Sequence, residues 1–156
     1  MDCLDQIIAR EGGLEDDKDD PGGLTKYGVS QHAFPHVDIR DLTPDDAKAL
    51  LNAKYIVAPH IDQIPDPQLR CQMSDWSVNS GPEVPIRALQ HILGVERDGE
   101  LGPVTLAALA QRDPKDINNR LATYRIAFLY DIVKANPRLA KFQRGWINRA
   151  KSFLLA

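Results

Sequence analysis

Apolar residues recur at intervals of three and four positions along most of this chain, and turn-forming residues separate the runs. Near the start, Leu4, Ile7 and Ile8 share one side of a helix that would end at the glycine pair 12–13. Strand-like alternation is confined to one short stretch, from Leu24 to Ser30. The sequence therefore predicts a mainly α-helical fold with a small irregular or β-hairpin element near residues 14–40.

Capping and stop residues set the limits of the predicted helices. Thr43 caps the second helix and Pro44 occupies its first position, an order typical of a helix N-terminus. The seven predicted helices cover 2–11, 43 to about 56, a segment after Pro67 that stops at Gly81, a segment from Ile86 to Gly94, 104–111, 116–135 and 138–155. Large aromatic side chains usually bury, so we expect four of them in the core, namely Trp76, Phe128, Phe142 and Trp146.

The length of 156 residues fits one domain. No repeat or low-complexity linker divides the chain, so we expect a single compact, two-lobed domain over 1–156 that acts as a monomer. No apolar stretch approaches the roughly 20 residues that span a bilayer, which predicts no stable membrane insertion. The first dozen residues do not resemble a signal peptide, and we expect synthesis in the cytoplasm.

Charge divides unevenly between the halves. Residues 1–75 hold 15 acidic against 7 basic side chains, and residues 76–156 hold 7 against 12. After Asp131 only cations follow: Lys134, Arg138, Lys141, Arg144, Arg149 and Lys151. Such a stretch attracts a polyanion, whether nucleic acid, anionic lipid or cell wall, or else is a solvated helix face. No nucleic-acid-binding module is recognisable, so nucleic acid is not an expected partner.

The two cysteines, Cys3 and Cys71, are too few for a disulfide framework. They also lack neighbouring histidines that would complete a zinc site. We therefore expect buried free cysteines, and no metal or cofactor.

Two carboxylates and a hydroxyl group suggest hydrolytic chemistry. Glu11 completes the first apolar stripe, and burial beside apolar groups raises the pKa of a glutamate enough for it to donate a proton near neutral pH. Asp20 precedes the turn at 21–23, and Thr25 follows it. An acid and a second group that positions water or stabilises an oxocarbenium ion satisfy the needs of glycoside hydrolysis. The alternatives are an exposed glutamate at a helix end and an aspartate that only shapes a turn.

The three side chains belong to the segment EGGLEDDKDDPGGLTKYGVS at 11–30. This segment resembles the signature of glycoside hydrolase family 108, the N-acetylmuramidases of phage endolysins, although Leu14 stands where the family usually has an aromatic residue. Shorter matches follow as DWSVNSGP at 75–82, ALQHILGV at 88–95, DGELGPVTLAAL at 98–109, RIAFL at 125–129 and GWINR at 145–149.

This resemblance implies a lysozyme-like fold and cleavage of the β-1,4 bond from N-acetylmuramic acid to N-acetylglucosamine in peptidoglycan glycan strands. It also implies a catalytic lobe over 1–84, with a helical peptidoglycan-binding-like region over 85–156 packed on it. Glu11 corresponds to the catalytic acid, and Asp20 and Thr25 complete the catalytic set. We expect Gly12, Gly23, Tyr27 and Asn79 to contact substrate, although Asn79 is equally suited to a helix-ending hydrogen bond.

An endolysin made in the cytoplasm reaches the wall from the periplasmic side after release by a separate, holin-like membrane partner. The same muramidase chemistry also serves particle release or toxin secretion, and the sequence does not separate these roles. A wall-binding module without catalysis is the alternative from another class. The presence of Glu11, Asp20 and Thr25 argues against it.

Overall fold

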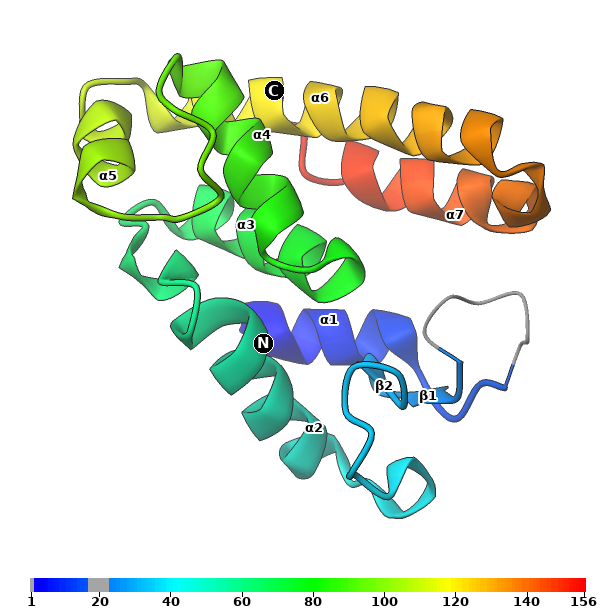
Figure 1. Cartoon of the computed structure of the whole chain (residues 1–156). Coiled ribbons are helices and arrows are strands. Elements are labelled where there is room, and N and C mark those ends of the chain that lie inside the picture. The colour runs from blue at the N-terminus through cyan, green and yellow to red at the C-terminus, as the bar shows by residue number, and fades with distance from the viewer. Residues whose placement is uncertain (1, 17–22) are drawn as a thin grey trace.

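A computed structural model describes residues 2–16 and 23–156, and of Glu11 it describes the main chain alone. The described residues are mostly helical and form one small sheet (Figure 1). The helices are α1 (Cys3–Glu11), α2 (Pro44–Asn52), α3 (Pro67–Ser80), α4 (Glu83–Leu93), α5 (Pro103–Ala110), α6 (Pro114–Ala135) and α7 (Ala140–Lys151). The strands β1 (Thr25–Lys26) and β2 (Val29–Ser30) pair antiparallel as a hairpin. The predicted mainly α-helical fold with a hairpin is confirmed.

Local capping explains where the first helices begin. The Asp2 side chain accepts a hydrogen bond from the amide of Asp5, and Thr43 does the same for Asp46, so both helices start with a capping box. A π-helical turn, Ala53–Val57, continues α2 to about the predicted end. The last helix is shorter than predicted because the chain turns after Lys151 and buries the ring of Phe153.

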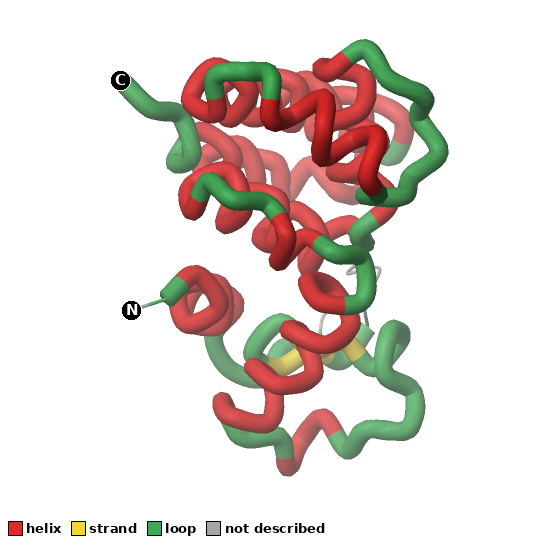
Figure 2. Tube along the Cα trace, turned by 90° about the vertical axis from the view of Figure 1, so that its left-hand side faces the viewer, coloured by secondary structure: helices red, strands yellow, loops and turns green. Residues whose placement is uncertain are grey.

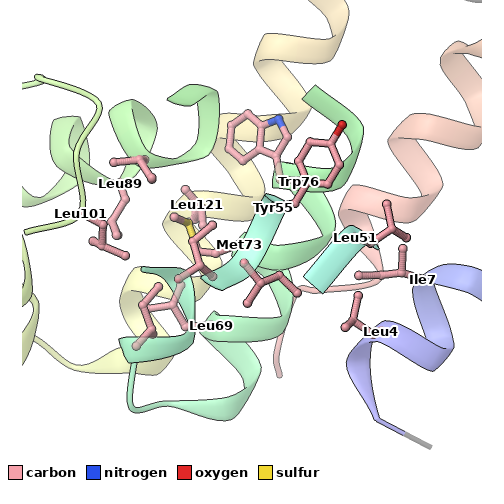
Figure 3. Close-up of a cluster of buried hydrophobic side chains, with 14 of the residues drawn as sticks. Leu4, Ile7, Leu51, Tyr55, Leu69, Met73, Trp76, Leu89, Leu101 and Leu121 are labelled. Carbon is pink, nitrogen blue, oxygen red and sulfur yellow. The ribbon is translucent and has the colours of Figure 1, made fainter. Parts of the chain in front are cut away.

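One apolar core extends through most of the molecule. Figure 3 shows side chains from α1, α2, α3, α4 and α6 within it, and Trp76 of α3 is fully buried. A smaller cluster between α6 and α7 consists of Leu129, Ile147 and Ala150. The phenyl ring of Phe128 packs edge-on against Trp76, at 5.5 Å between ring centres. The expected core position is thus confirmed for Trp76.

The hairpin and the last two helices lie in different parts of the molecule. Figures 1 and 2 show α1, α2 and the hairpin in one part of the molecule, and α4 to α7 in the other. The last two helices, α6 and α7, run antiparallel side by side and are joined by a 3₁₀ turn at Pro137–Leu139. None of the helices in the described ranges has the length and apolar character of a membrane-spanning segment.

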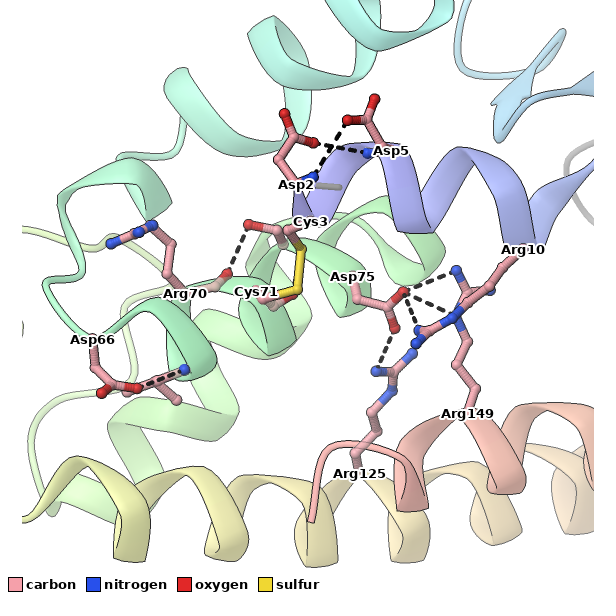
Figure 4. The surroundings of a disulfide bond; sticks show 12 residues. Asp2, Cys3, Asp5, Arg10, Asp66, Arg70, Cys71, Asp75, Arg125 and Arg149 are labelled. Atoms are coloured by element: carbon pink, nitrogen blue, oxygen red, sulfur yellow. Dashed lines mark hydrogen bonds and ion pairs between the residues drawn. A yellow bond between two sulfur atoms is a disulfide. The ribbon is translucent and has the colours of Figure 1, made fainter. Parts of the chain in front are cut away.

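The expectation of free cysteines is wrong. Cys3 of α1 and Cys71 of α3 form a disulfide, with their Cα atoms 5.5 Å apart (Figure 4). The two residues are 68 positions apart in the chain, so they look isolated in the sequence. Packing of the start of α1 beside α3 brings them together, and only the tertiary fold shows it.

Candidate active site

The end of α1 is joined to the hairpin by main-chain hydrogen bonds. Gly12, directly after Glu11, caps the helix with φ of 66°, a conformation that favours glycine. Its carbonyl accepts a 3.0 Å hydrogen bond from the amide of Tyr27. Beyond it, Glu15 and Thr25 exchange amide-to-carbonyl bonds of 2.8 and 2.9 Å. The main chain of Glu11 is therefore held next to the hairpin.

A cleft of about 290 Å³ opens between this hairpin and helices α6 and α7. Its size is at the low end of the roughly 300–1,000 Å³ typical of ligand pockets. The described residues that line it are Glu15, Thr25, Gly28, Ser30, Tyr55, Val78, Asn79, Ser80, Arg125, Leu129, Ile132, Leu139 and Trp146. They come from both halves of the chain, so neither half forms the cleft alone.

The two walls of the cleft differ in character. The hairpin and the end of α3 contribute mostly polar groups, among them Thr25 and Asn79. The α6–α7 side is mainly apolar and consists of Leu129, Ile132, Leu139 and Trp146, with Arg125 at its base. Tyr55 also lines the cleft, and burial raises the pKa of its hydroxyl group above the ordinary value.

Beneath the cleft, a buried carboxylate gathers three arginines (Figure 4). Asp75 is fully buried in α3, and its oxygens lie 2.8 Å from Arg125, 2.8 Å from Arg149 and 3.7 Å from Arg10. These cations come from α6, α7 and α1 respectively. Burial lowers the pKa of the Arg125 guanidinium, and the charge of Asp75 opposes that effect.

The prediction that all cations after Asp131 form one basic surface is wrong for Arg149. The side chain of Arg149 is only 12% exposed and pairs with Asp75. It therefore belongs to the interior and not to a solvated helix face. Lys134, Arg138 and Lys141 are exposed and continue to fit the surface interpretation.

The predicted catalytic residues are described to different degrees. Thr25 lines the cleft. Asp20 and the side chain of Glu11 lie outside the described residues, so their roles stay predictions. The main-chain position of Glu11, one residue before the Gly12 that bonds to the hairpin, is consistent with the predicted role.

The predicted substrate-contacting residues differ in where the structure places them. Asn79 lines the cleft from the end of α3. Gly12 and Gly23 both have positive φ, 66° and 70°, and both precede β1 in the chain. Tyr27 occupies the hairpin turn with φ of 53°, and its ring packs against the core. Substrate contact by these residues remains a prediction.

Of the described residues that line the cleft, sequence reasoning predicted only Thr25 and Asn79, and two of those it missed are important for the site. Glu15 is an exposed carboxylate at its rim, and its place in the matched segment 11–30 was the available signal. Trp146 was expected in the core, but it is half-buried and lines the cleft. Its placement depends on how α7 packs beside α6, which no local pattern predicts.

A mostly helical domain with a small hairpin beside a cleft of carboxylate, hydroxyl and amide groups has the architecture of a lysozyme-like glycoside hydrolase. Among the described residues, no group of three or more His, Cys, Asp or Glu side chains could hold a metal ion.

Comparisons with known proteins agree with this class. Residues 4–81 match the family model of glycosyl hydrolase 108, and residues 84–151 match a "Predicted Peptidoglycan domain". The chain therefore belongs to the glycosyl hydrolase 108 family, and it is a lysozyme-like N-acetylmuramidase that hydrolyses peptidoglycan.

A solved structure extends the likeness to nearly the whole chain. The structure of Brucella abortus SagA is 27% identical in sequence and has a TM-score of 0.84. The alignment covers 97% of this chain and 88% of that one. A comparison with curated proteins gave no match.

Proposed function

We propose that this muramidase cleaves the β-1,4 bond between N-acetylmuramic acid and N-acetylglucosamine, with Glu11 as the general acid. The observation that carries the proposal is the junction of α1 with the hairpin, where the Gly12 carbonyl accepts a hydrogen bond from the amide of Tyr27, the residue before Gly28 of the cleft lining. This junction brings the main chain of Glu11 to the same hairpin that presents Thr25 to the cleft.

In the proposed reaction, Glu11 donates its proton to the glycosidic oxygen as the bond from that oxygen to C1 of N-acetylmuramic acid breaks. Positive charge that develops on the sugar ring is stabilised by a carboxylate, the role we give to Asp20. A water molecule then adds to C1 and returns a proton to the enzyme. Thr25 orients the water or the sugar hydroxyl groups, and Gly12, Gly23, Tyr27 and Asn79 contact substrate.

Analysis of new reducing ends tests both the bond and the acid. Purified sacculi are digested, the products are reduced with borohydride, and the sugar alcohols are identified after acid hydrolysis. Muramitol supports the proposed bond, whereas glucosaminitol overturns it. Glu11→Gln removes the proton but keeps the side-chain shape, so sugar release should fall by about 10² to 10⁴. Near wild-type release by a folded Glu11→Gln variant would remove Glu11 from this role.

We further propose that the enzyme acts as a monomeric endolysin, made in the cytoplasm and released to the periplasm by a holin-like partner. Support comes from the disulfide between Cys3 and Cys71, a bond that persists in oxidising compartments such as the periplasm. Expression in a bacterial host should cause lysis only when a membrane-permeabilising protein is expressed as well, and lysis without that protein would overturn this role.

A further inference from the structure

The segment that matches the peptidoglycan domain contributes one wall of the cleft. Arg125, Leu129, Ile132, Leu139 and Trp146 all lie within residues 84–151, and all five line the same cleft as Thr25 and Asn79. A module that only anchored the protein to the wall would have no need to do so. This shared cleft raises the question of what the second segment contacts there.

Trp146 is the largest side chain on that wall. Its indole ring stacks on Phe142, with ring centres 5.4 Å apart and planes inclined by 21°. The chain contains two tryptophans, and they differ in exposure, because Trp76 is fully buried whereas Trp146 is half-buried and lines the cleft. Phe142 therefore supports Trp146 in a fixed position beside the aliphatic side chains of α6.

The opposite wall offers hydrogen-bonding groups. Thr25 and Ser30 of the hairpin carry hydroxyl groups, and Asn79 carries an amide at the end of α3. A pyranose ring has an apolar C–H face and a rim of hydroxyl and acetamido groups. Such a ring suits a cleft in which an aromatic and aliphatic wall faces a polar one.

We propose that Trp146 is a sugar-binding platform within the catalytic cleft, against which one pyranose ring of a peptidoglycan glycan strand packs. The occupant is the glycan and not the stem peptide, because the platform is continuous with the hairpin of the glycosyl hydrolase segment. The second segment thus binds the strand at the point of cleavage. This inference rests on the proposed function, since it takes the cleft as the place where substrate is cut.

Intrinsic fluorescence gives a direct test, because Trp146 is the tryptophan that ligand can reach in the cleft. The probe is soluble glycan strands from which an amidase has removed the stem peptides. The catalytically impaired Glu11→Gln variant is titrated, so that the strands stay intact. Binding should change the emission, and adding Trp146→Phe should abolish that change. Adding Trp146→Ala instead should raise Kd about tenfold, measured by calorimetry, which corresponds to about 1.4 kcal/mol.

Tyr130→Ala is the matched control. Tyr130 is a 50% exposed aromatic residue of α6 that borders a separate groove with Arg144 and Lys151. Its removal should leave both the emission change and Kd as they were. Unfolding midpoints of all variants establish that they are folded. If Trp146→Ala does not fold, Trp146→Phe still allows the test.

The outcomes separate this inference from the proposed function. If the reduced digest of the wild type contains muramitol but Trp146→Ala has unchanged Kd and KM for the strands, the platform is wrong and the muramidase assignment stands. If Glu11→Gln retains full activity while the Trp146 variants lose binding, the catalytic acid is wrong and the platform stands. An emission change that persists in Trp146→Phe overturns the platform, because the signal then comes from Trp76.

Discussion

Asp75 of α3 accepts a 2.8 Å hydrogen bond from Arg125 of α6, and both side chains are withdrawn from solvent. The bond joins the segment that matches glycosyl hydrolase 108 to the segment that matches the peptidoglycan domain. It also lies directly beneath the cleft, because Arg125 is one of the residues that line it. The geometry of the two cleft walls therefore depends on this ionic contact.

Replacing Asp75 should strongly destabilise the protein. Asp75→Asn keeps the shape of the side chain but leaves Arg125 and Arg149 buried without a counter-charge, which typically costs about 3–5 kcal/mol. Urea denaturation measures the loss. The control is Asp116→Asn, which breaks an exposed pair with Arg120 and should change stability by less than about 1 kcal/mol. Equal effects of the two substitutions would show that the buried cluster has no special role.

The disulfide should make a large contribution to stability. It closes a loop of 68 residues, and the chain-entropy model gives about 4 kcal/mol for a loop of that length. The Cys3→Ala/Cys71→Ala variant should therefore unfold at a lower urea concentration than the oxidised wild type. Reductant should bring the wild type down to the level of the variant and leave the variant unchanged. If reductant leaves the unfolding midpoint of the wild type unchanged, the disulfide does not stabilise the protein as expected.

The start of α1 should weaken in acid. The hydrogen bond from Lys48 is the main cause that lowers the pKa of Asp2 below its ordinary 3.8. A carboxylate with a lowered folded-state pKa stabilises the fold above its unfolded pKa, and that contribution is lost as the pH falls through the folded value. Asp2→Asn retains a good N-cap but has no charge to lose. Between about pH 5 and pH 2 the wild type should lose more stability than Asp2→Asn, measured by urea denaturation, and parallel curves would argue against this pair.

The polar wall of the cleft should affect catalysis and not stability. Thr25→Val keeps the side-chain shape and removes one hydroxyl group, so kcat/KM on soluble glycan strands should fall about tenfold, as expected for one lost hydrogen bond. Asn79→Ala should act in the same direction. Thr123→Val, at an exposed position of α6, is the control for the substitution itself. If Thr25→Val behaves like that control, Thr25 has no part in the reaction.

Helices and the hairpin could be predicted because their signals are local. The capping box at Thr43, for example, depends on residues within one turn. By contrast, the Asp75–Arg125 contact joins residues 50 positions apart, and the disulfide joins residues 68 positions apart. Sequence spacing contains no signal for such pairs, which is why the cysteines were expected to be free and Arg149 to be exposed. Thr25 and Asn79 could be placed near one cleft because the motif resemblance supplied the long-range information.

The exposed cations at the end of α6 should attract the wall without taking part in the chemistry. Lys134 lies in the last turn of α6, and Arg138 and Lys141 lie within two positions of Leu139 in the chain, a residue that lines the cleft. Attraction between exposed charges is screened over about 8 Å at physiological salt. Replacing all three with Gln should therefore weaken binding to intact sacculi at low ionic strength and flatten its salt dependence. Turnover of short soluble strands should change little.

A matched variant separates local from overall charge in this experiment. Arg112, Lys115 and Arg120 are also exposed, but they lie around the opposite end of α6. That helix has 22 residues, which corresponds to about 33 Å at 1.5 Å per residue, several screening lengths away. Replacing these three with Gln changes net charge equally, so it should affect sacculus binding less. If both triple variants bind equally weakly, net charge alone attracts the wall, and if both bind like the wild type, the cations are a solvated helix face.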